Sequence, residues 1–535
     1  MTTSVVSRPT ELEQEVARRR TFAIISHPDA GKTTLTEKLL LYGGAIELAG
    51  SVRARKNQRQ TTSDWMELEQ QRGISVTATA LQFDWKGVRL NLLDTPGHED
   101  FSEDTYRTLM AVDSAVMVID AARGIESQTR KLFDVCRQRQ IPILVFVNKL
   151  DHPSREPLAL LEEIEQVLEI DAVPLNWPIG DGPTFQGIYD LRQQQVLQFS
   201  RTAHGQTRAP VEVATLDGPE LTGLIGEQAA GQLREDVELL TVAGETFEFD
   251  RYIGGDLAPV FFGSALTNFG VEVFLDALID LAPPPQARPS DRGMIDPTNQ
   301  EFSGFVFKIQ ANMDPRHRDC MAFLRVCSGH FEKGVLVHHP RLGRDIRLAR
   351  PHRLFAGDRE TVESAYPGDV VGLVNPGVFA IGDTVCTGEA IQYRAIPRFQ
   401  PERFARLVSN DISRTKQMAK GLAQLDEEGA IQVFHSLDGT QRAVILGAVG
   451  DLQFEVTVAR LESEYGVTVR IEHLPYQFAR WVDGTQEQLA SAKWPRFGVQ
   501  RVVDRNDHVI LLFDSDRAPN FFTQENPSIP LRDLP

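Results

Sequence analysis

The feature that most constrains the fold is an eight-residue loop between an apolar run and a helical pattern. The loop consists of Ser26, His27, Pro28, Asp29, Ala30, Gly31, Lys32 and Thr33, and it follows the apolar residues 22–25. A strand, a loop ending in Gly-Lys-Thr and a helix start form, in this order, a phosphate-binding loop. Ser26 stands where a first glycine is usual, and serine is small enough for the tight turn. The loop therefore predicts a nucleotide-binding α/β domain.

A single motif of this kind also arises by chance in long chains, so the segments that follow it carry the argument. Each of three later apolar runs ends in polar or small residues: Asp94, Thr95, Pro96, Gly97 and His98 after 88–93; Asn148, Lys149, Leu150 and Asp151 after 141–147; Ser264 and Ala265 after 260–263. The carboxyl ends of parallel strands meet at one edge of a sheet. The order of the motifs predicts that all these residues and the loop bind one molecule of GTP.

The phosphate end of the predicted site offers groups that suit phosphate and Mg²⁺. Lys32 places a positive charge against the β- and γ-phosphates, and Gly97 lets a backbone N–H group approach the γ-phosphate closely. The hydroxyl of Thr33 can bind Mg²⁺ directly, and the carboxylate of Asp94 can hold it through water. The predicted cofactor is therefore Mg²⁺, with GTP as substrate and GDP as product.

Guanine is the predicted base because Asp151 carries only acceptors. Its two carboxylate oxygens match the two N–H donors on the pyrimidine edge of guanine, whereas adenine presents an acceptor there. Sites built on such pairing discriminate between bases by roughly 10⁴-fold or more. We expect Lys149 to lay its aliphatic stem along the base and the Ala265 N–H group to reach the guanine oxygen.

The order of these motifs resembles the translational GTPases. Residues 72–75 read Arg-Gly-Ile-Ser between the first two motifs, and in that family this segment is the first switch. The resemblance implies that the Ser75 hydroxyl binds Mg²⁺ when GTP is present, although threonine is commoner there. It also makes His98 the catalytic residue, which positions the attacking water or stabilises charge in the transition state. Taken alone, His98 could instead be a hydrogen-bonded structural histidine.

Charge and composition limit the partners. The net charge of −18 argues against a uniformly basic surface that wraps nucleic acid, but local basic patches can still dock on a ribosome. Two groups of basic residues are candidates: Arg53, Arg55, Lys56 and Arg59, and Arg341, Arg344, Arg347, Arg350 and Arg353. The second group also fits a solvated hairpin. Four scattered cysteines, no signal peptide and no apolar run of about 20 residues predict a cytoplasmic protein that does not enter a membrane.

The length of 535 residues predicts three or four domains, and the pattern along the chain favours three. Residues 1–283 are expected to form a translational-type, P-loop α/β GTPase domain, with an inserted subdomain at roughly 160–255. A proline-rich linker then leads to short apolar runs and turns at 284–395, which predict a β-barrel domain. Residues 396–535 are expected to form an α/β, ferredoxin-like C-terminal domain that ends in a loosely ordered tail.

Over its whole length the chain resembles the bacterial class II release factors, a branch of the translational GTPases. The resemblance implies a monomeric, ribosome-stimulated GTPase of translation termination. Such a protein promotes dissociation and recycling of the stop-codon-reading class I release factors after peptide release. The implied partners are the ribosome, with its rRNA and proteins, and the class I release factors. From the length of the chain we expect none of the further domains of elongation factor G. The alternatives are an elongation-type or ribosome-rescue GTPase, and a nucleotide-binding regulator that never uses a ribosome.

Overall fold

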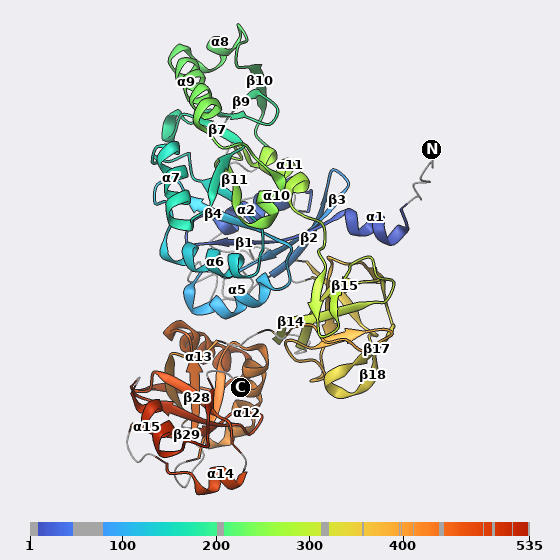
Figure 1. Ribbon diagram of the computed structural model, residues 1–535, viewed down its shortest axis with the longest axis vertical. Helices are drawn as coiled ribbons and strands as arrows, with labels where there is room; N and C mark the ends of the chain where they lie inside the picture. Colours follow the sequence, from blue (N-terminus) through green and yellow to red (C-terminus); the bar gives the residue numbers. More distant parts are fainter. Residues whose placement is uncertain are drawn as a thin grey trace.

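The computed structural model describes residues 9–45, 79–200, 208–311, 320–355, 358–394, 396, 399–409, 411–437, 443–484, 486–494, 498–515 and 517–532. These residues form three lobes, which are an α/β domain, a barrel-like sheet and a second α/β domain (Figure 1). The predicted first switch, with Ser75 and the basic residues 53–59, lies outside the described residues. None of the described helices is both long enough and apolar enough to cross a lipid bilayer.

The first lobe is built on a seven-stranded sheet in the order β2-β3-β1-β4-β5-β11-β6. Its strands are β1 (Arg19–Ser26), β2 (Thr79–Trp85), β3 (Val88–Asp94), β4 (Ser114–Asp120), β5 (Ile143–Asn148), β6 (Asp171–Pro174) and β11 (Leu257–Phe262). Only β2 runs antiparallel to its neighbour. The carboxyl ends of β1, β3, β5 and β11 therefore lie along one edge of the sheet, where the phosphate loop and the motifs at 94–98, 148–151 and 264–265 begin.

Helices cover both faces of this sheet, as expected when parallel strands are apolar on both sides. One layer holds α5 (Ser102–Leu109), α6 (Ser127–Gln138) and α7 (Pro157–Leu168), and the other holds α2 (Lys32–Tyr42), α10 (Phe249–Gly254) and α11 (Val271–Leu281). Strand β4 shows the alternation, because Met117 and Ile119 pack toward the first layer and Val116 and Val118 toward the second. A short helix, α1 (Glu11–Ala17), precedes β1 and starts with a capping box between Thr10 and Glu13.

The insert forms its own antiparallel sheet in the order β10-β9-β8-β7. The strands are β7 (Asn176–Ile179), β8 (Gly187–Asp190), β9 (Gln195–Phe199) and β10 (Val211–Thr215), followed by helices α8 (Leu221–Ile225) and α9 (Glu227–Ala243). The two helices meet at Gly226, whose φ of 88° ends the first one. This unit lies at the end of the molecule opposite the C-terminal domain (Figure 1).

The second lobe is an eight-stranded, barrel-like antiparallel sheet in the order β18-β17-β23-β14-β15-β22-β19-β20. Its strands are β14 (Ser303–Ala311), β15 (Cys320–Ser328), β17 (Leu336–His339), β18 (Arg344–Arg347), β19 (Pro351–Phe355), β20 (Asp358–Thr361), β22 (Val370–Val374) and β23 (Thr384–Cys386). The small pairs β12 (Arg288–Ser290) with β13 (Gly293–Ile295), and β16 (Phe331–Glu332) with β21 (Ser364–Ala365), stand beside it. Strands β17 and β18 form the hairpin that the arginine-rich segment suggested. Arg341 in that hairpin is ion-paired with Asp383.

The third lobe carries an eight-stranded sheet in the order β27-β24-β26-β25-β29-β30-β28-β31. Its strands are β24 (Arg403–Ser409), β25 (Gln432–Ser436), β26 (Val444–Ala448), β27 (Val469–Leu474), β28 (Phe478–Val482), β29 (Val499–Val503), β30 (Val509–Phe513) and β31 (Leu531–Arg532). Its helices are α12 (Thr415–Glu428), α13 (Asp451–Tyr465), α14 (Gln486–Ser491) and α15 (Ala518–Glu525). The prediction of a loosely ordered tail is wrong up to Arg532. Phe522 and Ile529 are buried there against β30, which ties the end of the chain to the sheet.

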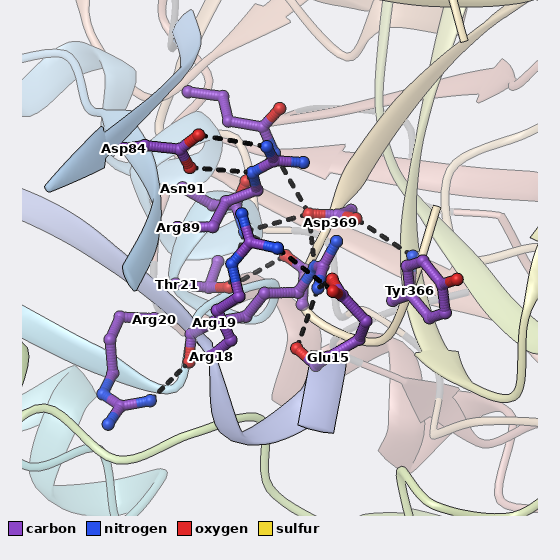
Figure 2. A network of polar contacts seen from close by, with 12 residues as sticks. Glu15, Arg18, Arg19, Arg20, Thr21, Asp84, Arg89, Asn91, Tyr366 and Asp369 are labelled. Atoms are coloured by element: carbon purple, nitrogen blue, oxygen red, sulfur yellow. Dashed lines mark hydrogen bonds and ion pairs between the residues drawn. The ribbon is translucent and has the colours of Figure 1, made fainter. Parts of the chain in front are cut away.

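Buried polar contacts join the barrel-like sheet to the first lobe. Figure 2 shows Arg19 of β1 beside Asp369, which closes the barrel turn 366–369; their Nε and Oδ1 atoms are 2.9 Å apart. The hydroxyl of Thr21 donates a hydrogen bond to the carbonyl oxygen of Gly368, at 2.8 Å. Arg325 of β15, in the barrel-like lobe, pairs with Asp113 of the first lobe, and both side chains are 1% exposed. Charges that are removed from water in this way must stay paired, so the two lobes are held in one arrangement.

The third lobe contacts the first at α5 and the second at the end of β14. Arg107 of α5 donates a hydrogen bond to the carbonyl oxygen of Glu428, at 3.0 Å. The Glu428 carboxylate accepts one from the Ala311 N–H group at 2.7 Å and pairs with Arg460 of α13 at 2.6 Å. All three lobes therefore meet at Glu428, the last residue of α12.

Gly368 offers a test of how tightly the first two lobes fit together. Its φ is 104°, and an added Cβ would lie 2.9 Å from Pro285 Cγ and 3.2 Å from Arg19 Cβ. We expect Gly368→Ala to lower the free energy of unfolding by about 2–3 kcal/mol, from backbone strain plus overpacking. Gly377→Ala is the control, because Gly377 has a φ of 88° but open space around its Cβ position. Urea unfolding of both variants measures the difference. If both variants lose the same free energy of unfolding, the interface accommodates the added methyl group at no extra cost.

Candidate nucleotide-binding site

The phosphate loop has a backbone that only glycine can adopt at its end. Gly31 has a φ of 99° and lies directly before α2, which starts at Lys32. A Cβ at this position would lie 2.2 Å from Nδ2 of Asn148. Asp29, two residues earlier, also has a positive φ, of 66°. The loop is therefore a narrow turn packed against the loop after β5, and it presents the start of an eleven-residue helix to the site.

Asn148 is the residue that joins the motifs. Its side chain is 2% exposed, its Nδ2 donates to the carbonyl oxygen of Ala30 at 2.9 Å, and its Oδ1 accepts from the Ala265 N–H group at 2.9 Å. One amide thereby connects the phosphate loop, the end of β5 and the loop after β11. The predicted residues 26–33, 148–151 and 264–265 are brought together at one edge of the sheet.

The carboxylate of Asp151 is held in a fixed orientation. The Ser264 hydroxyl donates to Asp151 Oδ1 at 2.6 Å, and Ser264 Oγ accepts from the Thr267 N–H group at 3.2 Å. His152 Nδ1 lies 2.9 Å from the other oxygen, Oδ2. The side chain of Asp151 is only 9% exposed. A carboxylate that is fixed from both sides can select a partner with donors at matching positions.

Asp120 is a site residue that the sequence analysis missed. Lys149 has a φ of 71°, and its Nζ donates to Asp120 Oδ2 at 2.8 Å. Burial acts to raise the pKa of Asp120, but the Lys149 ammonium group and the Ala122 N–H group lower it more, so the pKa lies below its usual value. The ionised carboxylate thus fixes the direction of the Lys149 stem. Its signal in the sequence is its place at the end of the apolar strand β4, the same place that Asp94 has in β3.

Opposite charges are buried at the phosphate end of the site. Lys32 Nζ lies 2.8 Å from Asp94 Oδ1, and the two side chains are 6% and 2% exposed. The Thr95 hydroxyl donates to the carbonyl oxygen of Ile24 at 2.7 Å, which fixes the loop after β3 to β1. A Cβ on Gly97 would lie 3.7 Å from Pro28 Cα, so the two loops are in van der Waals contact.

His98 lies at the rim of this region, on the turn that leads into the short helix η1 (Glu99–Phe101). The side chain is 34% exposed, and its Nδ1 accepts a hydrogen bond from the Asp100 N–H group at 3.2 Å. The ring also meets the edge of Phe101, with 6.3 Å between ring centroids. The predicted Mg²⁺ ligand Ser75 lies outside the described residues, so its place relative to Thr33 and Asp94 remains a prediction.

Three family models match successive parts of the chain. Residues 17–284 match the elongation factor Tu GTP binding domain, residues 301–388 match elongation factor G domain 2, and residues 393–523 match the class II release factor RF3, C-terminal domain. The first lobe is therefore an α/β GTPase domain of the elongation factor Tu type. The second is a barrel-like domain of the elongation factor G type, and the third is an α/β release-factor domain.

Curated relatives match nearly the whole chain. Peptide chain release factor 3 of Gloeobacter violaceus is 55% identical over 530 residues, which cover 99% of both chains. The protein of the same name from Synechocystis sp. is 57% identical over 504 residues, or 94% of this chain and 92% of the relative. A solved structure from Thermus thermophilus shares the fold, with a TM-score of 0.69 at 23% identity over 91% of this chain and 73% of the other.

These likenesses extend through all three domains, and the matched range 17–284 spans the segments that carry the nucleotide motifs. The chain belongs to the peptide chain release factor 3 family, and it is a translational GTPase of peptide chain termination.

Proposed function

We propose that this GTPase is stimulated by the ribosome and promotes dissociation of class I release factors once the peptide has been freed. The observation that carries the proposal is the pair of hydrogen bonds that Asn148 makes, donating to Ala30 and accepting from Ala265, because they gather the phosphate loop and both proposed base-recognition loops. The match of residues 393–523 to a release-factor domain favours termination over an elongation-type or ribosome-rescue role.

In the proposed site, the loops after β5 and β11 bind the base. The Asp151 oxygens accept from the two N–H donors of guanine, and Ser264 keeps the carboxylate in the required plane. Lys149, held by Asp120, covers one face of the base with its aliphatic stem. Asn148 and the backbone of Leu150 maintain the loop, while the Ala265 N–H group lies where a base oxygen can compete for it.

The phosphates are proposed to bind at residues 26–33, where backbone N–H groups, the helix start and Lys32 supply positive potential. The donor set fits Mg²⁺, because the Thr33 hydroxyl and the Asp94 carboxylate are hard oxygen ligands next to the phosphate loop. The resemblance to the translational GTPases adds the Ser75 hydroxyl as a third proposed group for Mg²⁺. When bound, Mg²⁺ would neutralise charge on the β- and γ-phosphate oxygens. Lys32 would exchange its bond to Asp94 for phosphate oxygens.

Hydrolysis is the attack of water on the γ-phosphorus, which yields GDP and phosphate. We propose that His98 acts on this step from the rim of the site, by orienting the water or by stabilising the charge that develops. With Nδ1 accepting the Asp100 N–H group, a neutral His98 carries its proton on Nε2. The side chain is therefore able to donate from Nε2 to water or to a phosphate oxygen.

The role of Asp94 can be tested by its dependence on Mg²⁺. We expect Asp94→Asn to raise the Mg²⁺ concentration for half-maximal GTP hydrolysis by ~10-fold or more. Replacing a carboxylate that contacts a metal through a bound water lowers metal affinity by about this factor. Asp84→Asn, on the adjacent strand and 51% exposed, is the control. If the Asp94 variant and the unmodified protein need the same Mg²⁺ concentration, Asp94 serves only as a structural partner of Lys32.

The function itself is tested on ribosomes halted at a stop codon and carrying a labelled class I release factor. We expect GTP turnover to rise strongly when ribosomes are added, and the labelled factor to dissociate faster when this protein and GTP are both present. Turnover that ignores ribosomes would overturn the proposal and leave a GTPase with another activator. Ribosome-stimulated turnover without faster dissociation would point to the elongation-type or rescue alternative.

Finer features of fold and setting belong to the same proposal. We infer domain boundaries near residues 283 and 395, and an insert within roughly 160–255 whose own sheet and helices run from β7 to α9. We also infer a cytoplasmic monomer whose partners are the ribosome and class I release factors. The first half of the C-terminal domain is interpreted as ferredoxin-like. The order β27-β24-β26-β25, with α12 after β24 and α13 after β26, supports that interpretation.

A further inference from the structure

Helix α13 of the C-terminal domain receives its N-terminal hydrogen bond from the GTPase domain. The Leu452 N–H group, in the first turn of α13, donates to Asp100 Oδ2 at 2.7 Å, although the two residues are 352 positions apart. A helix start needs such an acceptor, which the residue before the helix normally supplies. Here that residue is Gly450, which has no side chain. The carboxylate of Asp100, on η1, takes its place.

Gly450 is needed for space and not for its backbone angles. Its φ and ψ, −142° and 168°, are an extended conformation that any residue adopts. A Cβ on Gly450 would nevertheless lie 2.1 Å from the Asp100 carboxylate. An alanine at this position would therefore have to displace the Asp100 side chain.

The turn that carries Asp100 also carries the contact to His98. The Asp100 N–H group donates to His98 Nδ1 at 3.2 Å, and Asp100 Oδ1 lies 3.4 Å from the same nitrogen. The next residue, Phe101, is buried against Leu452 and Val456 of α13. One three-residue turn thus contacts His98 on one side and the C-terminal domain on the other.

We propose that Asp100 is a positioning residue for His98, and that the N-terminus of α13 holds Asp100 in the position that orients the His98 ring. The inference rests on the proposed catalytic role of His98. The Asp100 N–H group occupies Nδ1 and leaves Nε2 as the nitrogen that can reach water or phosphate. Docking of the C-terminal domain thereby becomes a condition for efficient hydrolysis, although the residues of the proposed nucleotide site all come from the GTPase domain.

A purely structural cap makes a different prediction. A helix cap that affects only folding would lower the free energy of unfolding by its usual modest amount and leave the rate of hydrolysis unchanged. The two roles are separated by measuring single-turnover GTP hydrolysis on ribosomes and GTP affinity in the same full-length variants.

We expect Asp100→Ala to slow single-turnover hydrolysis by ~10-fold, because the turn whose N–H group orients His98 loses the hydrogen bond that ties it to Leu452, with GTP affinity within about twofold. Asp100→Asn should keep most of the rate, because its amide oxygen can still accept from the Leu452 N–H group. Gly450→Ala should slow hydrolysis by a similar factor as Asp100→Ala, since its methyl group displaces the carboxylate. Asp451→Asn, an exposed change in the same helix turn, is the matched control and should hydrolyse GTP at the normal rate.

Two double variants then test the connection. In the Asp100→Ala background, Gly450→Ala should have no further effect, because the methyl group no longer meets a carboxylate. In a His98→Ala background, Asp100→Ala should also add nothing, because it acts through His98.

The inference is overturned if Asp100→Ala hydrolyses GTP at the normal rate, if the Gly450 and Asp100 effects multiply, or if a loss of GTP affinity accounts for the change. If His98→Ala itself hydrolyses normally, the proposed function of His98 fails as well. If His98→Ala is slow while Asp100→Ala and Gly450→Ala are not, only the positioning role fails.

Discussion

Replacing His98 by alanine should lower ribosome-stimulated GTP hydrolysis by at least ~10²-fold, the lower range for loss of one positioned catalytic group. The affinity for GTP should stay nearly unchanged, because His98 lies at the rim of the site and is proposed to act only in the transition state. Its 34% exposed side chain bonds to the turn of Asp100 and makes no hydrogen bond to the phosphate loop among the described residues. Truncation should therefore leave the fold of the site intact.

The measurement combines single-turnover hydrolysis on ribosomes halted at a stop codon with titration of a fluorescent GTP analogue. His508→Ala is the control, since His508 is half exposed and bonds to Asp504 in the C-terminal domain. Hydrolysis by the His98 variant at the unmodified rate would make His98 a structural residue. A parallel loss of GTP affinity would show that His98 contributes to GTP binding and does not act only in the transition state.

Asp151→Asn should weaken binding of GTP and GDP by roughly 10²-fold. The amide places an N–H donor against an N–H donor of guanine, and loss of a hydrogen bond to a charged group has an effect of this order. In the unmodified protein Asp151 Oδ1 lies 2.6 Å from Ser264 Oγ. The amide oxygen of the variant can accept the same hydrogen bond, so the contact to Ser264 is retained. The variant should accordingly fold normally and change only its preference for the base.

Xanthine nucleotides provide the positive control for Asp151→Asn. Xanthine presents an acceptor where guanine presents a donor, so XTP affinity should rise in the variant while ATP affinity stays low. Equal GTP affinity in the variant and the unmodified protein, measured by equilibrium titration, would contradict base recognition by residues 148–151.

The gathering of the predicted site residues at one edge of the sheet could be foreseen because their motifs depend on local chemistry. Gly31 must have a positive φ beside Asn148, and a strand that ends in a carboxylate or an amide is visible as an apolar run with a polar end. The family resemblance then gave the order of the domains, and the matches to residues 17–284 and 393–523 agree with that order.

The contacts that the sequence analysis missed depend on the arrangement of distant segments. The bond from Lys149 to Asp120 requires that β4 lie beside β5, and the bond from Leu452 to Asp100 requires a docked C-terminal domain. The end of the chain was misjudged for a related reason. Its proline and asparagine residues suggested a loose tail, whereas Phe522 is held by stacking on Trp494, and neither residue belongs to a regular apolar pattern.

The joint between the GTPase and barrel-like domains has a consequence for how the protein responds to ionic strength. Dissolved ions screen charges that they can approach, such as Lys86 and Asp276, which are 55% and 26% exposed. They cannot approach Arg325 and Asp113, each 1% exposed, and separating these two buried charges has a cost that added salt does not reduce. Added salt therefore weakens the pairs on the surface first and leaves this joint closed. We therefore expect the two domains to stay joined when the salt concentration changes across the physiological range.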